Sequence, residues 1–169
     1  MVKVIITGPE SSGKTTLVQS LAAHYQTSWL PEYARSYIDQ LDRPYQEEDL
    51  LKIAEGQVQQ EDTAARSHPR LLLCDTSLLV IKIWSDYRYG RCHPWITEQL
   101  AKRPVDHYLL CRPDLAWEPD PQRENPHDRD ELFSLYQQAL RTQTHTTIEG
   151  GRDQRIKKSA EAVDRLLSN

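Results

Sequence analysis

Five short apolar or β-branched segments alternate with helical patterns along the chain. In Leu71–Cys74 and Tyr108–Cys111 the apolar residues are continuous and do not alternate with polar ones. Such runs are typical of strands buried on both faces of a parallel sheet that is covered by helices. We therefore expect strands at Val2–Thr7, Ser28–Pro31, Arg70–Asp75, Asp106–Cys111 and His145–Glu149.

Helical spacing fills the intervals between these strands. Leu17, Leu21 and Tyr25, for example, recur every four residues after the first strand. Alternation of strands and helices predicts a doubly wound α/β fold, with helices on both faces of one sheet. We expect residues 1–169 to form a single domain. The predicted helices are Lys14–Gln26, Ala34–Leu41, Glu47–Arg66, Leu78–Tyr89, Trp95–Lys102, Asp130–Thr142 and Asp153–Leu167.

The stretch from Pro113 to Arg129 breaks this alternation. It holds four prolines among many charged residues, at Pro113, Pro119, Pro121 and Pro126. Long polar connections inside a compact domain are usually functional lids or disordered segments. We expect a lid-like segment over about residues 113–129.

Composition changes this picture little. The 169 residues carry a formal net charge of −4 without a basic block, which disfavours a nucleic-acid partner. No apolar run reaches the roughly 20 residues that a membrane helix needs, and a first strand at Val2 leaves no room for a leader peptide. Cys74, Cys92 and Cys111 lack metal-ligand spacing, so we expect reduced thiols in a cytoplasmic protein.

The strongest chemical signal is the stretch Gly8–Thr15, which reads GPESSGKT and fits the phosphate-loop pattern G-x-x-x-x-G-K-[ST]. It lies between the first apolar strand and a helical pattern, which is the context that the motif requires. The two glycines permit backbone angles closed to other residues, and the loop turns successive N–H groups toward an anion.

We expect this loop to bind ATP or another nucleoside triphosphate, together with Mg²⁺. Lys14 would reach the β- and γ-phosphates, and the Thr15 hydroxyl would ligate the metal. The dipole of the following helix adds positive potential. The predicted nucleotide-binding residues are Gly8, Glu10, Ser11, Ser12, Gly13, Lys14, Thr15, Thr16, Arg129 and Arg155.

Asp75 ends the third predicted strand, beside the loop in a parallel sheet. An acid at that position can hold Mg²⁺ directly or through water, and it also lies where substrates bind in such folds. The alternative is a helix cap for the next helix, with Thr76 and Ser77 as rival caps.

Glu32 follows the second predicted strand, on the expected acceptor side. A carboxylate there can accept the proton of an attacking hydroxyl group as a general base. Alternatively, Glu32 only favours the start of its helix through the helix dipole. Arg35, one turn further on, either contacts the acceptor or pairs with Glu32.

Three further residues are candidates. Arg123 and Arg129 lie in the proline-rich segment, where a closing arginine can stabilise charge on a transferring phosphoryl group, although such charges are often only solvated. Gln57 follows Gly56 inside a helical pattern. A helical glycine costs roughly 1 kcal/mol relative to alanine, which suggests close packing or ligand approach there. We place Gln57 with Glu32, Arg35 and Asp75 in the acceptor site.

Several sequence blocks together resemble the nicotinamide riboside kinase domain of bacterial NAD-salvage proteins. They follow the phosphate loop in this order: Leu30–Arg35, Asp49–Leu50 with Ile53, Ala54, Gly56 and Gln57, Asp75–Thr76, Gly90 with His93–Pro94, and Pro113–Asp114 with Trp117, Asp120 and Arg123. The likeness runs from Val2 to about Arg155.

This resemblance implies ATP-dependent phosphorylation of nicotinamide riboside to nicotinamide mononucleotide by a stand-alone kinase. It implies a three-layer phosphate-loop fold, similar to nucleoside and nucleotide kinases, with a five-stranded parallel sheet in the order 2-3-1-4-5. Lys14, Glu32 and Arg123 would then be catalytic. Pro31 stands where the family has an aromatic residue, Ser77 replaces a second aspartate, and Pro119–Pro121 replaces an acidic run ending in glycine.

Two alternative functions remain at this stage. One is a kinase for another nucleoside or small hydroxyl compound, since deoxynucleoside kinases also carry a glutamate after strand two and an arginine-rich lid. The other is a switch protein whose nucleotide state controls a partner. A switch would hydrolyse or exchange nucleotide without a small acceptor, whereas a kinase would require one.

Overall fold

Five parallel strands form the central sheet of the computed structural model, which describes residues 1–168. Their order, β2-β3-β1-β4-β5, and the parallel direction of every pair confirm the predicted sheet. The carboxyl ends of β1 and β3 lie side by side, because Ile6 pairs with Asp75. The strands are β1 (Val2–Thr7), β2 (Trp29–Leu30), β3 (Leu71–Asp75), β4 (His107–Cys111) and β5 (His145–Ile148).

The helices lie within a few residues of their predicted bounds. α5 begins at Pro94, one residue before the prediction, because proline at the first helical position gives up only an N–H group that has no partner within the helix. α6 ends at Ala139, three residues before the prediction. The helices are α1 (Lys14–Tyr25), α2 (Tyr33–Asp39), α3 (Glu47–Ala65), α4 (Leu78–Tyr89), α5 (Pro94–Lys102), α6 (Arg129–Ala139) and α7 (Arg152–Leu167).

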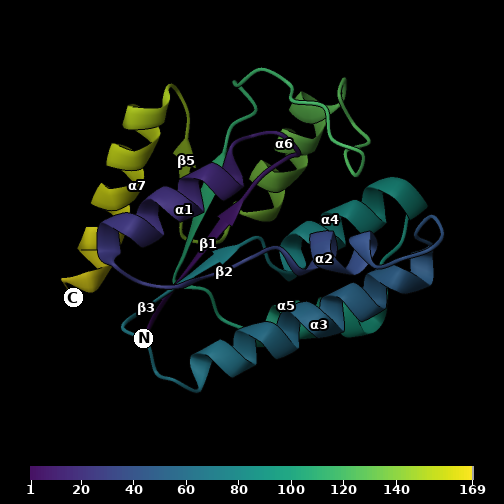
Figure 1. Ribbon diagram of the computed structural model, residues 1–169, viewed down its shortest axis with the longest axis horizontal. Helices are drawn as coiled ribbons and strands as arrows, with labels where there is room; N and C mark the ends of the chain where they lie inside the picture. Colours follow the sequence, from purple (N-terminus) through teal and green to yellow (C-terminus); the bar gives the residue numbers. More distant parts are fainter. Residues whose placement is uncertain (169) are drawn as a thin grey trace.

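Helices cover both faces of the sheet (Figure 1). Val4 and Ile6 of β1 face a core that includes residues of α1 and α7, and Ile5 between them faces the core formed with α4 and α6. A third cluster joins α2, α3, α4 and α5 at the side of the sheet. The three layers explain why the inner strands read as continuous apolar runs.

β2 is shorter than predicted. Only Trp29 and Leu30 pair with β3, because Pro31 has no N–H group to continue the ladder and Glu32 already precedes α2. The chain therefore leaves the sheet directly before Glu32.

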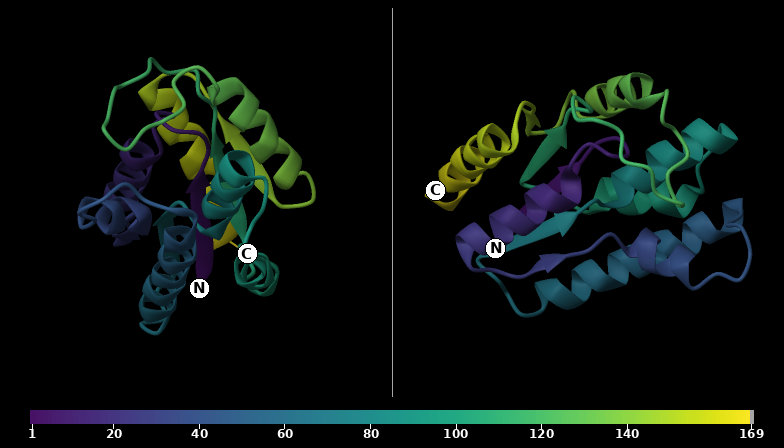
Figure 2. Two further views of the ribbon diagram at one scale, coloured as in Figure 1. Left: turned by 90° about the vertical axis from the view of Figure 1, so that its right-hand side faces the viewer. Right: turned by 45° about the horizontal axis from the view of Figure 1, so that its top comes forward.

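The segment between β4 and α6 contains no helix or strand, as its prolines predict. It runs as a long loop beside α6 (Figure 2). Asp114 anchors its beginning by accepting a hydrogen bond from the Gly150 amide at 2.7 Å and by pairing with Arg155. The Trp117 ring lies next to the Arg123 and Arg129 guanidinium groups, 6.0 and 5.6 Å from its centroid. We call residues 113–128 the lid segment.

Two further features concern the hydropathy of the helices and the state of the cysteines. No helix within residues 1–168 is long and apolar enough to cross a bilayer. The three cysteines are free, with Cys74 and Cys111 buried and Cys92 partly exposed.

Candidate active site

The phosphate-binding loop joins β1 to α1. Gly8 has φ +138°, and a Cβ there would lie 2.6 Å from the carbonyl oxygen of Cys111. Gly13 has φ +83°, and a Cβ would lie 2.9 Å from a Leu115 methyl group. Ser11 also has a positive φ, +53°. These angles turn the backbone so that successive amides can face an anion at the N-terminus of α1.

Side chains of the loop itself and of α7 donate hydrogen bonds to the loop's backbone carbonyls. The Lys14 ammonium and the Ser12 hydroxyl both donate to the carbonyl of Pro9, each at 2.7 Å. Arg155, buried to 4% exposure, donates to the carbonyl of Ser12 at 2.8 Å and to that of Gly150 at 2.8 Å. Arg155 thus joins α7 to the back of the loop, and its guanidinium is already occupied by protein partners.

Thr15 and Asp75 form a pair at the carboxyl ends of β1 and β3. The Thr15 hydroxyl donates to Asp75 Oδ2 at 2.5 Å, and the buried Oδ1 has no hydrogen-bond partner among residues 1–168. Ser77, not Asp75, caps α4 by accepting from the Leu79 amide. A buried carboxylate oxygen free to coordinate, beside a hydroxyl group, fits Mg²⁺, which prefers hard oxygen ligands.

Charge also suits this pair to a cation. Burial raises the pKa of Asp75, while Lys14 and the hydrogen bond from Thr15 lower it in part. A cation bound at Oδ1 would favour the ionised form for the same electrostatic reason.

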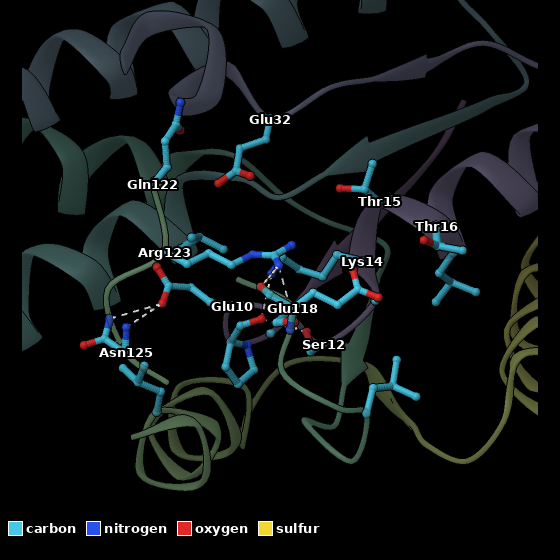
Figure 3. A pocket seen from close by; sticks show the side chains of 18 of the residues that line it. Glu10, Ser12, Lys14, Thr15, Thr16, Glu32, Glu118, Gln122, Arg123 and Asn125 are labelled. Carbon is cyan, nitrogen blue, oxygen red and sulfur yellow. Dashed lines mark hydrogen bonds between the residues drawn. The ribbon is translucent and has the colours of Figure 1, made fainter. Parts of the chain in front are cut away.

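Glu32 lines the same cavity as the loop and is partly exposed. It precedes α2 as the N-cap residue, but its side chain makes no cap hydrogen bond. Figure 3 shows its carboxyl group pointing toward the region where Lys14 and Arg123 also point. Burial raises the pKa of Glu32, and Lys14 opposes that rise. This is the environment of a carboxylate that can hold a proton more readily than one in water.

The shared cavity measures about 330 Å³. The phosphate loop and the start of α1 form one end, and Glu32 with apolar and aromatic side chains of α2, α4 and α6 forms the other. The cavity therefore has room for a phosphate group at the loop and for a second molecule at the other end, and Lys14 and Glu32 both line it. The apolar and aromatic residues at the second end are Ala34, Ile38, Val80, Ile83, Trp84, Tyr87, Leu132 and Tyr136.

Arg35 lines the cavity, as a residue that contacts the acceptor would, but it does not form the alternative pair with Glu32. Its guanidinium pairs with Asp120 of the lid segment at 2.9 Å, not with Glu32. Gln122 adds a second link from the lid to α2 by donating to Asp39 at 2.5 Å. The lid segment is therefore attached to the helix that Glu32 precedes.

Arg123 of the lid segment and Arg129 at the start of α6 lie against the phosphate loop. Arg123 donates to the Glu118 carbonyl and lies 3.5 Å from the Ser11 hydroxyl oxygen. Arg129, the first residue of α6, donates to the carbonyls of Ser11 and Leu115 at 3.1 and 2.9 Å. Arg123 lines the cavity, whereas Arg129 is not among the lining residues and instead braces the loop from its side.

Glu10 connects loop and lid in a way that the motif does not indicate. Its carboxylate accepts from the backbone amides of Glu124 and Asn125, the latter at 2.9 Å. In this arrangement a side chain of the phosphate loop thus satisfies two amides of the lid segment.

Gln57 lies outside the cavity, contrary to its expected place in the acceptor site. It is 1% exposed and its amide contacts the Tyr33 amide and the Glu61 carboxylate. It sits on the buried face of α3, behind the segment that carries Glu32, so the packing of α3 against α2 prevents direct contact with an acceptor in this arrangement.

The aromatic end of the cavity was not predicted from the sequence. Val80, Ile83, Trp84 and Tyr87 follow one another at spacings of three, one and three residues along α4. That pattern indicates an apolar helix face but does not distinguish a face that packs into the core from one that lines a cavity. Tyr136 of α6 is no more conspicuous in the sequence, since it continues the apolar face with Leu132 and Phe133.

A family model described as an AAA domain matches residues 3–155 of the chain. Two curated relatives are trifunctional NAD biosynthesis/regulator proteins named NadR. The protein of Escherichia coli strain K12 is 30% identical over 145 residues, covering 81% of this chain and 35% of the relative. That of Salmonella typhimurium strain LT2 is 31% identical over 123 residues, covering 69% and 30%. The chain thus spans about a third of their length.

Two solved structures share the fold. A NadR protein in complex with NAD and AMP-PNP matches with a TM-score of 0.74 and 20% identity, over 99% of this chain and 50% of that one. A NadR protein in complex with NR matches with a TM-score of 0.76 and 19% identity, over 99% and 52%. The two curated relatives confirm the resemblance to NAD-salvage proteins that the sequence blocks indicated, and the two structures confirm the fold.

Proposed function

The chain belongs to the AAA-domain family of phosphate-loop proteins, and from the geometry of its cavity we propose that it is an ATP-dependent kinase that phosphorylates the 5′-hydroxyl group of nicotinamide riboside. The observation that carries this proposal is one cavity with a phosphate-binding loop at one end and the carboxylate of Glu32 at the other. That carboxylate makes no capping hydrogen bond to α2. The relatives' role in NAD biosynthesis and the NR-bound neighbour support the choice of acceptor.

The residues divide the reaction between them. The loop amides and Lys14 bind the β- and γ-phosphates of ATP, and Glu32 accepts the proton of the attacking hydroxyl group. Thr15 and Asp75 would hold Mg²⁺, which when bound neutralises phosphate charge and orients the triphosphate. Arg123 reaches the γ-phosphoryl group from the lid and stabilises the charge on its equatorial oxygens. Arg155 and Arg129 keep the loop in the binding shape from behind.

The aromatic end of the cavity supplies the acceptor site. Trp84 and Tyr87 come from one face of α4, and the Trp84 indole donates to the Tyr45 hydroxyl at 3.0 Å, which fixes the ring. Pro31 leaves no aromatic side chain before Glu32, so Trp84 and Tyr87, with Tyr136 of α6, are the aromatic side chains of the cavity that a planar pyridine ring would contact.

A coupled assay of ADP release across nicotinamide riboside and a panel of nucleosides and deoxynucleosides tests the proposal. We expect turnover with nicotinamide riboside, product analysis showing the 5′-monophosphate, and little ADP release without an acceptor. Turnover only with another nucleoside would retain the kinase mechanism and reject the acceptor. Fast acceptor-independent hydrolysis would favour a nucleotide switch and reject both.

A further inference from the structure

The backbone around Glu32 has little support from the sheet. β2 ends at Leu30, Pro31 has no N–H group, and Tyr33 begins α2. The first N–H groups of a helix have no partner within it, and the Glu32 side chain does not supply one. The position of the candidate base therefore depends on groups outside its own strand and helix.

Those groups come from α3, which packs beside α2 (Figure 1). Gln60 donates from Nε2 to the carbonyl of Pro31 at 2.8 Å, and Gln57 accepts at Oε1 from the amide of Tyr33 at 3.3 Å. One side chain of α3 thus holds the residue before Glu32, and another holds the residue after it. Because Gln57 caps the first turn of α2 from a neighbouring helix, the Glu32 carboxylate stays available to the cavity.

A buried ion pair fixes the orientation of the Gln57 amide. Its Nε2 donates to Glu61 Oε1 at 3.2 Å, and Glu61 also pairs with Lys3 of β1 at 2.5 Å. An ionised carboxylate only accepts hydrogen bonds, so the NH₂ group must face Glu61 and the carbonyl oxygen must face Tyr33. The contacts run from β1, the strand that leads into the phosphate loop, to the segment that carries Glu32.

Gly56 completes the arrangement. A Cβ at this position would lie 2.0 Å from the Tyr33 ring, so only glycine lets α3 approach α2 this closely. The close approach of Tyr33 explains the glycine that interrupts the helical pattern.

We infer that Gly56, Gln57 and Gln60 of α3 are positioning residues that set the place of Glu32 relative to the phosphate loop. The inference rests on the proposed function, since it assigns these residues a role through the candidate base. None of the three lines the cavity that holds the phosphate loop and Glu32.

Matched substitutions along one helix test the inference. Gln57→Met and Gln60→Met keep side-chain length and remove the hydrogen bonds, and Gln59→Met makes the same change at an exposed neighbouring position. Small misplacements of a reacting group can reduce a rate by up to about a hundredfold. We expect Gln57→Met and Gln60→Met to lower kcat by roughly 10- to 100-fold with unchanged KM for ATP, and Gln59→Met to behave as wild type. Equal kcat in all three variants would overturn the inference.

A double-mutant cycle separates positioning from general stability. If Gln60 acts through Glu32, the effect of Gln60→Met on kcat should largely disappear in a Glu32→Gln background, because the base is already gone. The same fold loss in both backgrounds would reject the inference. Gln60 is partly exposed, so this variant serves even where the buried Gln57→Met fails to fold.

Hydrogen exchange gives a readout that needs no acceptor. In the free protein the Tyr33 amide should exchange roughly two- to tenfold faster in Gln57→Met than in Gln59→Met, as expected for one lost hydrogen bond. Identical exchange would overturn the inference whatever the substrate. Altered exchange combined with an inactive wild type on nicotinamide riboside would instead reject the proposed acceptor and leave the positioning role intact.

Discussion

Glu32 combines two properties that oppose each other. A carboxylate in a partly buried cavity destabilises the folded protein when ionised, yet a general base must be ionised to act. Burial raises the pKa of Glu32, and Lys14 limits the rise. Burial therefore opposes the charge of Glu32, and the nearby cations Lys14 and Arg35 favour it.

Glu32→Gln should lower kcat by about 10²- to 10⁴-fold, the range that general-base catalysis usually contributes, with little change in the Kd for ATP. Because the folded-state pKa lies above the unfolded-state value, ionisation of Glu32 lowers stability at pH values above the folded pKa. That loss is absent below the unfolded-state pKa of about 4.3. The Gln variant should thus melt at or above the wild-type temperature at pH 8, with the difference gone near pH 4.

Steady-state kinetics, nucleotide titration and melting curves on this one variant decide the matter. An active Glu32→Gln enzyme would exclude the base assignment. If Glu32 merely favoured the start of α2, the variant would be slightly less stable at pH 8 and fully active.

Lys14→Ala should nearly abolish turnover and weaken ATP binding without unfolding the protein. Within residues 1–168 the Lys14 ammonium donates only to the Pro9 carbonyl, so its removal breaks one hydrogen bond and no ion pair. Its contribution grows as charge develops on the transferring phosphoryl group. Lys52→Ala, an exposed change on α3, is the control. A near-wild-type rate in folded Lys14→Ala would contradict the proposed role of the loop.

At the scale of single residues the sequence predicts some positions much better than others. The phosphate loop is contiguous, so Gly8 to Thr15 can be placed from the motif alone, and Asp75 follows because strand ends in a parallel sheet lie at one edge. Gln57 could not be placed in this way. Its position in the sequence places it on α3, but whether its side chain faces the cavity or the backbone amide of Tyr33 depends on how α3 packs against α2.

At the scale of elements, the lid segment contacts both the phosphate loop and α2. Glu10 of the phosphate loop accepts from the Glu124 and Asn125 amides, and Arg35 of α2 pairs with Asp120. The Arg35–Asp120 pair is partly exposed, and solvent-accessible pairs usually contribute at most about 1 kcal/mol, so it adds little to the stability of the fold. The lid segment is thus attached to elements at both ends of the cavity.

Arg123→Ala should therefore reduce kcat more than it raises the KM for either substrate. An arginine that engages charge chiefly in the transition state behaves in this way. Arg141→Ala, an exposed change beyond α6, is the control. A variant with higher KM and unchanged kcat would mean that Arg123 binds substrate uniformly, and its catalytic role would be withdrawn.

Elements were predicted well where their signals were local. The inner strands β1, β3 and β4 are continuous apolar runs, and α4 ends at the glycine that follows it, in a left-handed conformation. β2 was predicted too long, because the effect of Pro31 on the ladder depends on the partner strand. The contacts of the lid segment could not be predicted, since its many charges fit solvent and protein partners equally well in sequence.

At the scale of the whole molecule, the cavity lies between elements that are far apart in the sequence. The phosphate loop, α2, α4, the lid segment and α6 all contribute to it. Nucleotide bound there contacts the folded protein and not the unfolded chain. Ligand binding must then raise the stability of the entire fold, which makes melting temperature a measure of the site.

MgATP at about 100 times its Kd should stabilise the protein by about 2.7 kcal/mol, which for a domain of this size corresponds to roughly 5–10 °C in Tm. Asp75→Asn should lose much of the part of this shift that depends on Mg²⁺, because the buried Oδ1 no longer carries charge to a cation, while the amide oxygen can still accept from Thr15. EDTA should reduce the wild-type shift toward that of the variant. Asp42→Asn, an exposed change outside the cavity, should retain the full shift.

Without nucleotide, Asp75→Asn should be at least as stable as wild type at neutral pH, since burial raises the pKa of Asp75 and its charge therefore lowers stability above that pKa. Equal MgATP shifts in Asp75→Asn and Asp42→Asn would show that the metal is held elsewhere.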